Sequence, residues 1–183
     1  MSDSNLTKQA LANSLKALME EKPFEKITIT DIVKRCNLNR LTFYYHFKDK
    51  YDLMNWIYYT ETAQIMMQNR TFDEWADCLC ALCYYMQENK NFYLNALNTT
   101  GQNSFPEYLL QYIRDISMAL VEGRLNKEKV DEKETLFIIE FFSQAIMGLI
   151  KQWAQDNMQL DPRNYVNIIK AIIEASMQHE LFR

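Results

Sequence analysis

Glycine and proline are both scarce in this sequence, with only three of each among 183 residues. Sandwiches and barrels built from many short strands need these residues in their turns, so the composition argues against such folds and favours long helices. Hydrophobic residues make up 48% of the chain, which is enough for one or two compact cores. The composition therefore predicts an all-α fold.

Long apolar runs are also missing. No stretch approaches the roughly 18 consecutive apolar residues of a membrane-spanning helix, and the opening "MSDSNLTKQALANSL" lacks the basic-then-apolar order of a signal peptide. We therefore expect a cytoplasmic protein without membrane contacts, in which the four cysteines stay reduced. Three of them follow a C-x-C-x2-C order at Cys78, Cys80 and Cys83, but on a helix the first and last point about 140° apart. We expect no metal site, because three such thiolates do not converge on one ion.

Residues typical of catalysis are sparse as well. Histidine occurs only twice, at His46 and His179, and there is no G-x-S-x-G elbow, glycine-rich phosphate loop or H-E-x-x-H pair. Acidic pairs such as Asp131 and Glu132 lie where helices are expected to begin, and capping explains them. We expect neither an enzyme nor a bound cofactor.

The net charge of −4 is unevenly distributed. Residues 1–55 contain nine basic and seven acidic residues, whereas residues 56–183 contain eleven and seventeen. This asymmetry is compatible with a nucleic-acid-facing N-terminal end on an acidic body, although many solvated surfaces have similar charge.

Local patterns predict two helices at the start of the chain. Apolar residues recur at helical spacing from Leu6 to Met19, so a first helix ends before Pro23. Thr28 followed by Asp31 has the pattern of a capping box, which begins a short second helix.

A tight turn and a third helix come next. Asn37 suits the left-handed backbone conformation, Leu38 points to the core, and Asn39 caps a helix that begins at Arg40. In this third helix Phe43 and Phe47 lie four residues apart and share a core-facing side.

The other side of the third helix combines hydroxyls, an imidazole and a guanidinium. It comprises Arg40, Leu41, Thr42, Tyr44, Tyr45 and His46. Such a face suits phosphates and base edges. Periodicity alone equally allows a second hydrophobic contact, in which Leu41, Tyr44 and Tyr45 pack on another helix.

A family resemblance separates these two readings. The stretch "ITITDIVKRCNLNRLTFYYHFKDKYDL" resembles the DNA-binding domain of the TetR family, whose helix-turn-helix is followed by a "TxYxHFxxKxxL" signature. The resemblance covers residues 7–54 and departs from the usual pattern at Asn37, where glycine is common, and at Leu41, where a small residue or proline often occurs. It implies a helix-turn-helix protein that binds a DNA operator.

The resemblance also implies which residues contact DNA. Phosphate contacts fall to residues at the start of the second helix, to polar residues of the third, and to a lysine near the start of the fourth. Arg40 is the candidate base reader, suited to guanine O6 and N7, with Tyr44 or Thr30 as a second, and Leu41 is placed to touch a thymine methyl group. For Lys48 a solvated charge is an equally good interpretation. The expected DNA-binding residues are Thr28, Thr30, Asn39, Arg40, Leu41, Thr42, Tyr44, Tyr45, His46 and Lys50.

Beyond this head the chain is expected to stay helical. A fourth helix spans about residues 50–68, a short one 90–98, and four others begin near residues 72, 105, 132 and 162 at box-like starts or at Asp161–Pro162. This makes about nine helices, as is usual in the family. We expect a DNA-binding domain at 1–54 and a helical body for dimerisation and effector binding at 55–183.

The last two long helices are unusually apolar. Residues 135–153 carry more hydrophobic side chains than one buried stripe needs, which a homodimer through residues 132–180 would explain. The alternative is a fully buried central helix in a monomer. The resemblance implies the former, with two heads that read a palindromic operator.

The effector of the body is left open. Ten methionines and many aromatic rings would suit an apolar ligand cavity, but core filling explains them as well. The patches "FYLNALNTTGQNSFPEYL" and "GLIKQW" resemble a TetR branch that includes activators of dihydroxyacetone kinase operons, which implies a protein co-activator related to a kinase subunit. We therefore expect a homodimeric transcription regulator controlled by a small-molecule or protein effector. The alternative is a helical adaptor or ligand carrier that no longer binds DNA.

Overall fold

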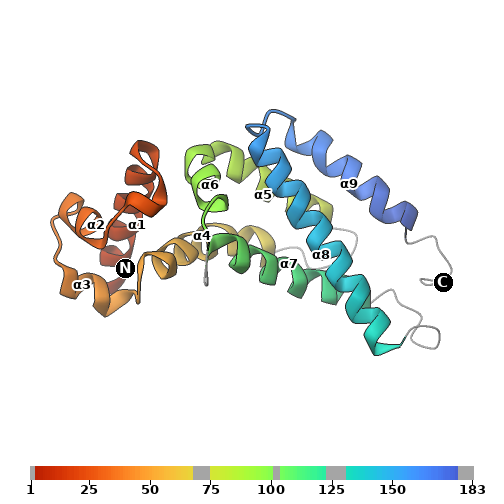
Figure 1. Ribbon diagram of the computed structural model, residues 1–183, viewed down its shortest axis with the longest axis horizontal. Coiled ribbons are helices and arrows are strands. Elements are labelled where there is room, and N and C mark those ends of the chain that lie inside the picture. Colours follow the sequence, from red (N-terminus) through yellow and green to blue (C-terminus); the bar gives the residue numbers. More distant parts are fainter. Residues whose placement is uncertain (1–2, 68–74, 101–103, 123–130, 177–183) are drawn as a thin grey trace. The chain divides into compact units, whose positions relative to one another are not determined.

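The computed structural model describes residues 3–67, 75–100, 104–122 and 131–176 (Figure 1). Within these ranges the chain forms nine α-helices and one short 3-10 helix, η1, which confirms the all-α prediction. They are α1 (Asp3–Glu21), η1 (Phe24–Lys26), α2 (Ile29–Arg35), α3 (Arg40–His46), α4 (Lys50–Met67), α5 (Trp75–Glu88), α6 (Lys90–Leu97), α7 (Phe105–Glu122), α8 (Glu132–Gln155) and α9 (Pro162–Ser176). None of these described helices is long and apolar enough to cross a membrane.

The helix boundaries follow the caps that the sequence predicts. The capping box of Thr28 and Asp31 begins α2, and the same reciprocal arrangement between Asp131 and Glu134 begins α8. The predicted start near residue 72 lies outside the described residues, and α5 is described from Trp75 onwards.

One compact unit consists of residues 1–63 together with residues 89–108. Within it α1 packs against α2 and α6, and α2 packs against α3. The Ser14 hydroxyl of α1 donates a hydrogen bond of 2.7 Å to the Ile32 carbonyl of α2. The core of this unit includes Leu11, Leu15, Phe24, Ile32, Phe43 and Leu53, all buried.

The second compact unit consists of residues 64–88 and 109–183. Here α5 packs along α9, and Arg163 pairs with Asp77 at 2.6 Å. The rings of Trp153 and Tyr165 stack between α8 and α9, with their centroids 5.7 Å apart. These units are defined by packing, so the functional division predicted at residues 54 and 55 stays a prediction.

Candidate nucleic-acid interface

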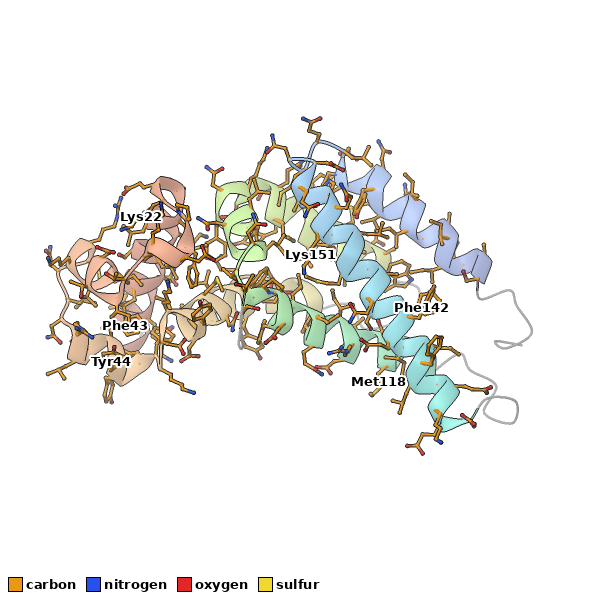
Figure 2. The ribbon with its side chains drawn as sticks, viewed as in Figure 1. Lys22, Phe43, Tyr44, Met118, Phe142 and Lys151 are labelled. Atoms are coloured by element: carbon orange, nitrogen blue, oxygen red, sulfur yellow. The ribbon has the colours of Figure 1, made fainter. Side chains whose placement is uncertain are left out.

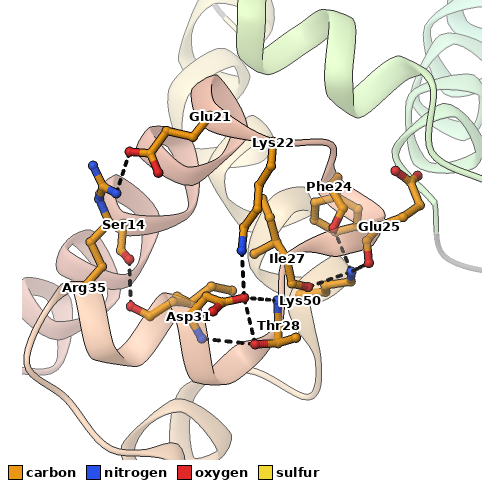
Figure 3. Close-up of polar contacts among 11 residues, drawn as sticks. Ser14, Glu21, Lys22, Phe24, Glu25, Ile27, Thr28, Asp31, Arg35 and Lys50 are labelled. Atoms are coloured by element: carbon orange, nitrogen blue, oxygen red, sulfur yellow. Dashed lines mark hydrogen bonds and ion pairs between the residues drawn. The ribbon is translucent and has the colours of Figure 1, made fainter.

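The start of α2 is fixed by hydrogen bonds around one carboxylate (Figure 3). The Thr28 hydroxyl accepts a hydrogen bond from the Asp31 backbone N–H and donates one of 2.8 Å to the Asp31 carboxylate. That carboxylate also accepts from the Thr28 backbone N–H and from Lys22, 3.0 Å away. These bonds, led by the one from the Thr28 backbone, lower the pKa of Asp31 to about 2. Lys22 thereby ties the end of α1 to the start of α2.

The turn between α2 and α3 has the predicted geometry. Asn37 adopts a φ of 54°, the left-handed conformation that most side chains disfavour and asparagine tolerates. The Leu38 backbone N–H donates to the Val33 carbonyl, which closes the turn, and the Leu38 side chain is half-buried. The turn therefore holds α3 at a fixed angle to α2.

Asn39 caps α3 as the sequence predicts. Its side-chain oxygen accepts hydrogen bonds from the Thr42 backbone N–H, at 2.8 Å, and from the Thr42 hydroxyl, at 3.1 Å. These two hydrogen bonds fix the first turn of α3.

The two faces of α3 differ completely in exposure. Phe43 is fully buried and Phe47, at the end of the helix, is 3% exposed, as predicted. Phe43 and its chain neighbour Tyr44 lie on different faces of the helix (Figure 2). Leu41 and Tyr45 are each 82% exposed, so no helix within the described ranges covers them.

Arg40 and Tyr44 form a pair on the exposed face. The Arg40 guanidinium donates to the Tyr44 hydroxyl at 3.4 Å and lies 5.9 Å from the centre of its ring. Both side chains are exposed one helical turn apart. The face thus offers a guanidinium, two phenols and a leucine side chain to one ligand.

The other predicted site residues differ in exposure and in their contacts. Thr28 is exposed, Thr30 and His46 are half-exposed, and the His46 ring contacts the Tyr45 ring edge-on. The Lys50 ammonium points elsewhere: it donates to the carbonyls of Phe24, Glu25 and Ile27 at 2.8, 3.2 and 2.9 Å (Figure 3).

The sequence did not indicate the role of Asn95, which belongs to the unit formed by residues 1–63 and 89–108. Asn95 of α6 donates from its amide nitrogen to the carbonyls of Met19 and Lys22, and its oxygen accepts from the Phe24 backbone N–H at 2.8 Å. No local pattern marks it, because its partners lie 71 to 76 residues away in the chain.

A second exposed surface lies on α8 and α9, and we call it the α8–α9 apolar face. On α8 the buried side follows Ile139, Met147 and Ile150, while Phe137 and Phe141 are 73% and 61% exposed on the other side. On α9 Ile168 and Ile172 are also exposed. The face comprises Phe137, Phe141, Gly148, Ile168 and Ile172. A fully buried central helix, the monomer alternative, does not fit these exposures.

Metal-binding and thiol chemistry find little support in the described part of the chain. The four cysteines are free thiols, and burial raises the pKa of Cys83 to about 12. Among the described residues no three His, Cys, Asp or Glu side chains are grouped so as to hold a metal ion.

Comparison with known proteins agrees with the geometry of the head. Residues 13–56 match the family described as bacterial regulatory proteins, tetR family, and residues 73–175 match a transcriptional regulator C-terminal region of that family. The chain is 30% identical over 153 residues to the HTH-type dhaKLM operon transcriptional activator DhaS of Lactococcus lactis subsp. lactis (strain IL1403), which covers 83% of this chain and 81% of the relative.

Two solved structures share the fold. One is titled dihydroxyacetone kinase operon activator DhaS, with a TM-score of 0.69, 20% identity, and coverage of 94% of this chain and 96% of that one. The other is a TetR transcriptional regulator from Streptococcus agalactiae 2603V, with a TM-score of 0.67, 19% identity, and coverage of 91% and 94%. With an exposed face on the second helix of a helix-turn-helix and family matches to both parts of the chain, this protein belongs to the TetR family of DNA-binding transcription regulators.

Proposed function

We propose that the protein binds a palindromic DNA operator as a homodimer and that an effector acting on its C-terminal body controls this binding. The observation that carries the proposal is the two-sided α3, with Phe43 and Phe47 buried and Leu41 and Tyr45 fully presented to the outside. Because the buried side of α3 anchors it to the core, its exposed side can enter the major groove without loss of core contacts.

The residues of the head take different roles in this proposal. Arg40 reads a guanine through its paired N–H donors, and Leu41 contacts a thymine methyl group. The surrounding hydroxyls, the His46 imidazole and the start of α2 grip phosphates. Because the Thr28 hydroxyl already donates to Asp31, a phosphate contact there requires that hydroxyl to exchange its acceptor.

The homodimer rests on the α8–α9 apolar face. Large apolar side chains at 55–73% exposure on two adjacent helices are typical of an interaction surface. Gly148 lies on the same side of α8 as Phe137 and Phe141. A Cβ added there would meet, within 4 Å, no atom of the described residues outside its own stretch of helix. Glycine in a helix interior costs about 1 kcal/mol relative to alanine, and close approach by a second copy would explain its presence.

The effector is either a small metabolite or a protein co-activator. The relative named as a dhaKLM operon transcriptional activator supports control of an operon by this chain, which would place the protein in the cytoplasm with its DNA. A saturable rise in melting temperature with one metabolite would identify a small-molecule effector, because a ligand that prefers the native state stabilises it. No rise with any metabolite, together with a stable complex with a kinase-like protein encoded nearby, would identify a co-activator.

The DNA-binding proposal is tested with the full-length chain and the duplex upstream of its own gene. Fluorescence anisotropy at two salt concentrations should show saturable binding that weakens with salt, and a scrambled duplex of equal length serves as the control. Equal affinity for both duplexes, or no binding, would contradict the proposal and favour an adaptor or carrier.

A further inference from the structure

Phe24, the first residue of η1, has both of its backbone groups held by side chains from distant parts of the same unit. Its N–H donates to the Asn95 side chain of α6, and its carbonyl accepts from the Lys50 ammonium of α4. The Phe24 side chain is fully buried. The short connection between α1 and α2 is therefore fixed from two sides.

Lys50 uses its whole hydrogen-bonding capacity on this connection. An ammonium has three donors, and three carbonyl oxygens accept from Lys50 within 3.2 Å. Its nitrogen also lies 4.5 Å from the centre of the Phe24 ring. Burial lowers the pKa of this lysine from its ordinary value, as expected for a cation withdrawn from water.

Asn95 satisfies carbonyls that the end of a helix leaves open. The last carbonyls of an α-helix have no partner within the helix. At the end of α1 the Met19 and Lys22 carbonyls accept from the Asn95 amide at 3.0 and 3.1 Å. α6 is thereby joined to the same connection that Lys50 holds.

These contacts lead directly to the DNA-facing start of α2. Lys50 donates to the Ile27 carbonyl, and Ile27 immediately precedes the cap residue Thr28. Lys22, whose carbonyl Asn95 holds, contributes its ammonium to the Asp31 carboxylate of the same cap. Lys50 from α4 and Asn95 from α6 therefore hold the connection from which α2 begins.

We propose that Lys50 and Asn95 are positioning residues that hold α2 in its DNA-competent place, and that the Lys50 charge is not among the phosphate contacts. The inference rests on the proposed DNA binding. The sequence-based alternative is that Lys50 leaves its three carbonyls and contacts a phosphate in the complex.

The salt dependence of DNA affinity separates these two roles. Lys50→Met keeps the apolar stem and removes the donors, so affinity should fall about tenfold because fewer molecules hold α2 correctly. The slope of log affinity against log salt should stay that of the wild type, whereas a lost phosphate contact lowers it by about 0.9 per charge. Lys26→Met is the matched control, because Lys26 is an exposed lysine of the same connection. If this variant loses DNA affinity, the slope of log affinity against log salt should fall as well.

Two further variants extend the test. Lys50→Arg keeps the charge, but a planar guanidinium cannot direct three donors to carbonyls around one point, so affinity should fall as in Lys50→Met. Asn95→Ala should weaken binding several-fold at an unchanged slope, and the double variant should be less than additive because both residues hold Phe24. Circular dichroism and light scattering confirm that each variant is folded and has the wild-type mass.

Hydrogen exchange keeps the inference testable without DNA. The backbone amides of Phe24 and of residues 27–31 should exchange faster in Lys50→Met and Asn95→Ala than in the wild type or in Lys26→Met. Unchanged exchange there, a Lys50→Met slope lower by one charge, or full affinity in Lys50→Arg would each overturn the inference. A wild type that binds no DNA would contradict the proposed function instead, and exchange would still decide the positioning roles. If Lys50→Met does not fold, Lys50→Arg tests the role of the Lys50 charge, and Asn95→Ala carries the slope and exchange measurements for the positioning role.

Discussion

Arg40 has the chemistry and the exposure of a base reader, and its contact with Tyr44 limits the orientations of its guanidinium. Arg40→Ala should therefore cost about 1–3 kcal/mol at the operator and relax discrimination at one position in each half-site, while non-specific binding falls far less. Competition binding with operators substituted at single positions measures this. Tyr44→Phe keeps the ring and removes the hydroxyl, so a smaller loss at the same position is expected. Wild-type discrimination in Arg40→Ala would rule out this role.

Phe47 acts on the same region through packing alone. It is 3% exposed and contacts the rings of Phe43 and Trp56. Phe47→Ala should destabilise the protein by about 3–5 kcal/mol through the cavity that it leaves, and so lower the melting temperature. Tyr45→Ala removes an aromatic ring that is 82% exposed and should leave the melting temperature nearly unchanged. Equal melting temperatures for the two variants would contradict the assignment of faces on α3.

At the scale of helices, two carboxylates make stability depend on acid. The pKa of Asp31 is about 2, chiefly through the Thr28 backbone, and that of Glu140 on α8 is about 2, chiefly through its hydrogen bonds with Arg114 of α7. Both values lie below the ordinary ones of 3.8 and 4.5. Folding thus gains stability from these groups above about pH 4.5, and loses it as the pH falls towards 2.

We therefore predict that the urea midpoint falls steeply between pH 4.5 and about 2. Asp31→Asn combined with Glu140→Gln should lower stability at neutral pH but flatten this decline. The two pH profiles, measured by urea unfolding at fixed ionic strength, test the assignment. Parallel profiles would show that other groups cause the acid dependence.

Helix starts could be predicted from the sequence because caps are local. The capping boxes of α2 and α8 and the Asn39 cap each join residues three apart, so both partners of each interaction can be identified from a short stretch of sequence. Helical spacing also predicted that the exposed set on α3 faces away from Phe43 and Phe47, and the family resemblance favoured its exposure over packing on another helix. These parts of the head and of the fold needed no knowledge of tertiary contacts.

Contacts between distant segments could not be predicted in this way. The Lys50 acceptors lie 23 to 26 residues away, and nothing in their sequence distinguishes a carbonyl that a lysine holds. On α8 the sequence indicated an excess of apolar residues but not its direction. Only the packing of α8 shows that Phe137 and Phe141 are the residues left uncovered, while Ile139 and Ile150 are buried.

At the scale of the whole molecule, the α8–α9 apolar face determines the assembly that we propose. Light scattering should give about twice the 21.9 kDa chain mass at micromolar concentration. Phe141→Glu and Ile172→Glu should each give monomers. Operator binding should weaken, because a monomer brings only one DNA-binding head to the operator instead of two. Met118→Glu, at an apolar residue of α7 that is 41% exposed, is the matched control and should stay dimeric. A stable monomeric wild type would rule out the homodimer.

Asn95 also has a consequence for engineering regulators from this protein. A head cut off after residue 56, where the N-terminal family match ends, would lack the amide that holds Met19, Lys22 and Phe24. Chimeras that transplant this head onto another body should carry residues 89–108 with it, or supply an equivalent amide from the recipient. The compact unit that contains the helix-turn-helix is discontinuous in sequence, and residues 89–108, which include α6, are its second segment.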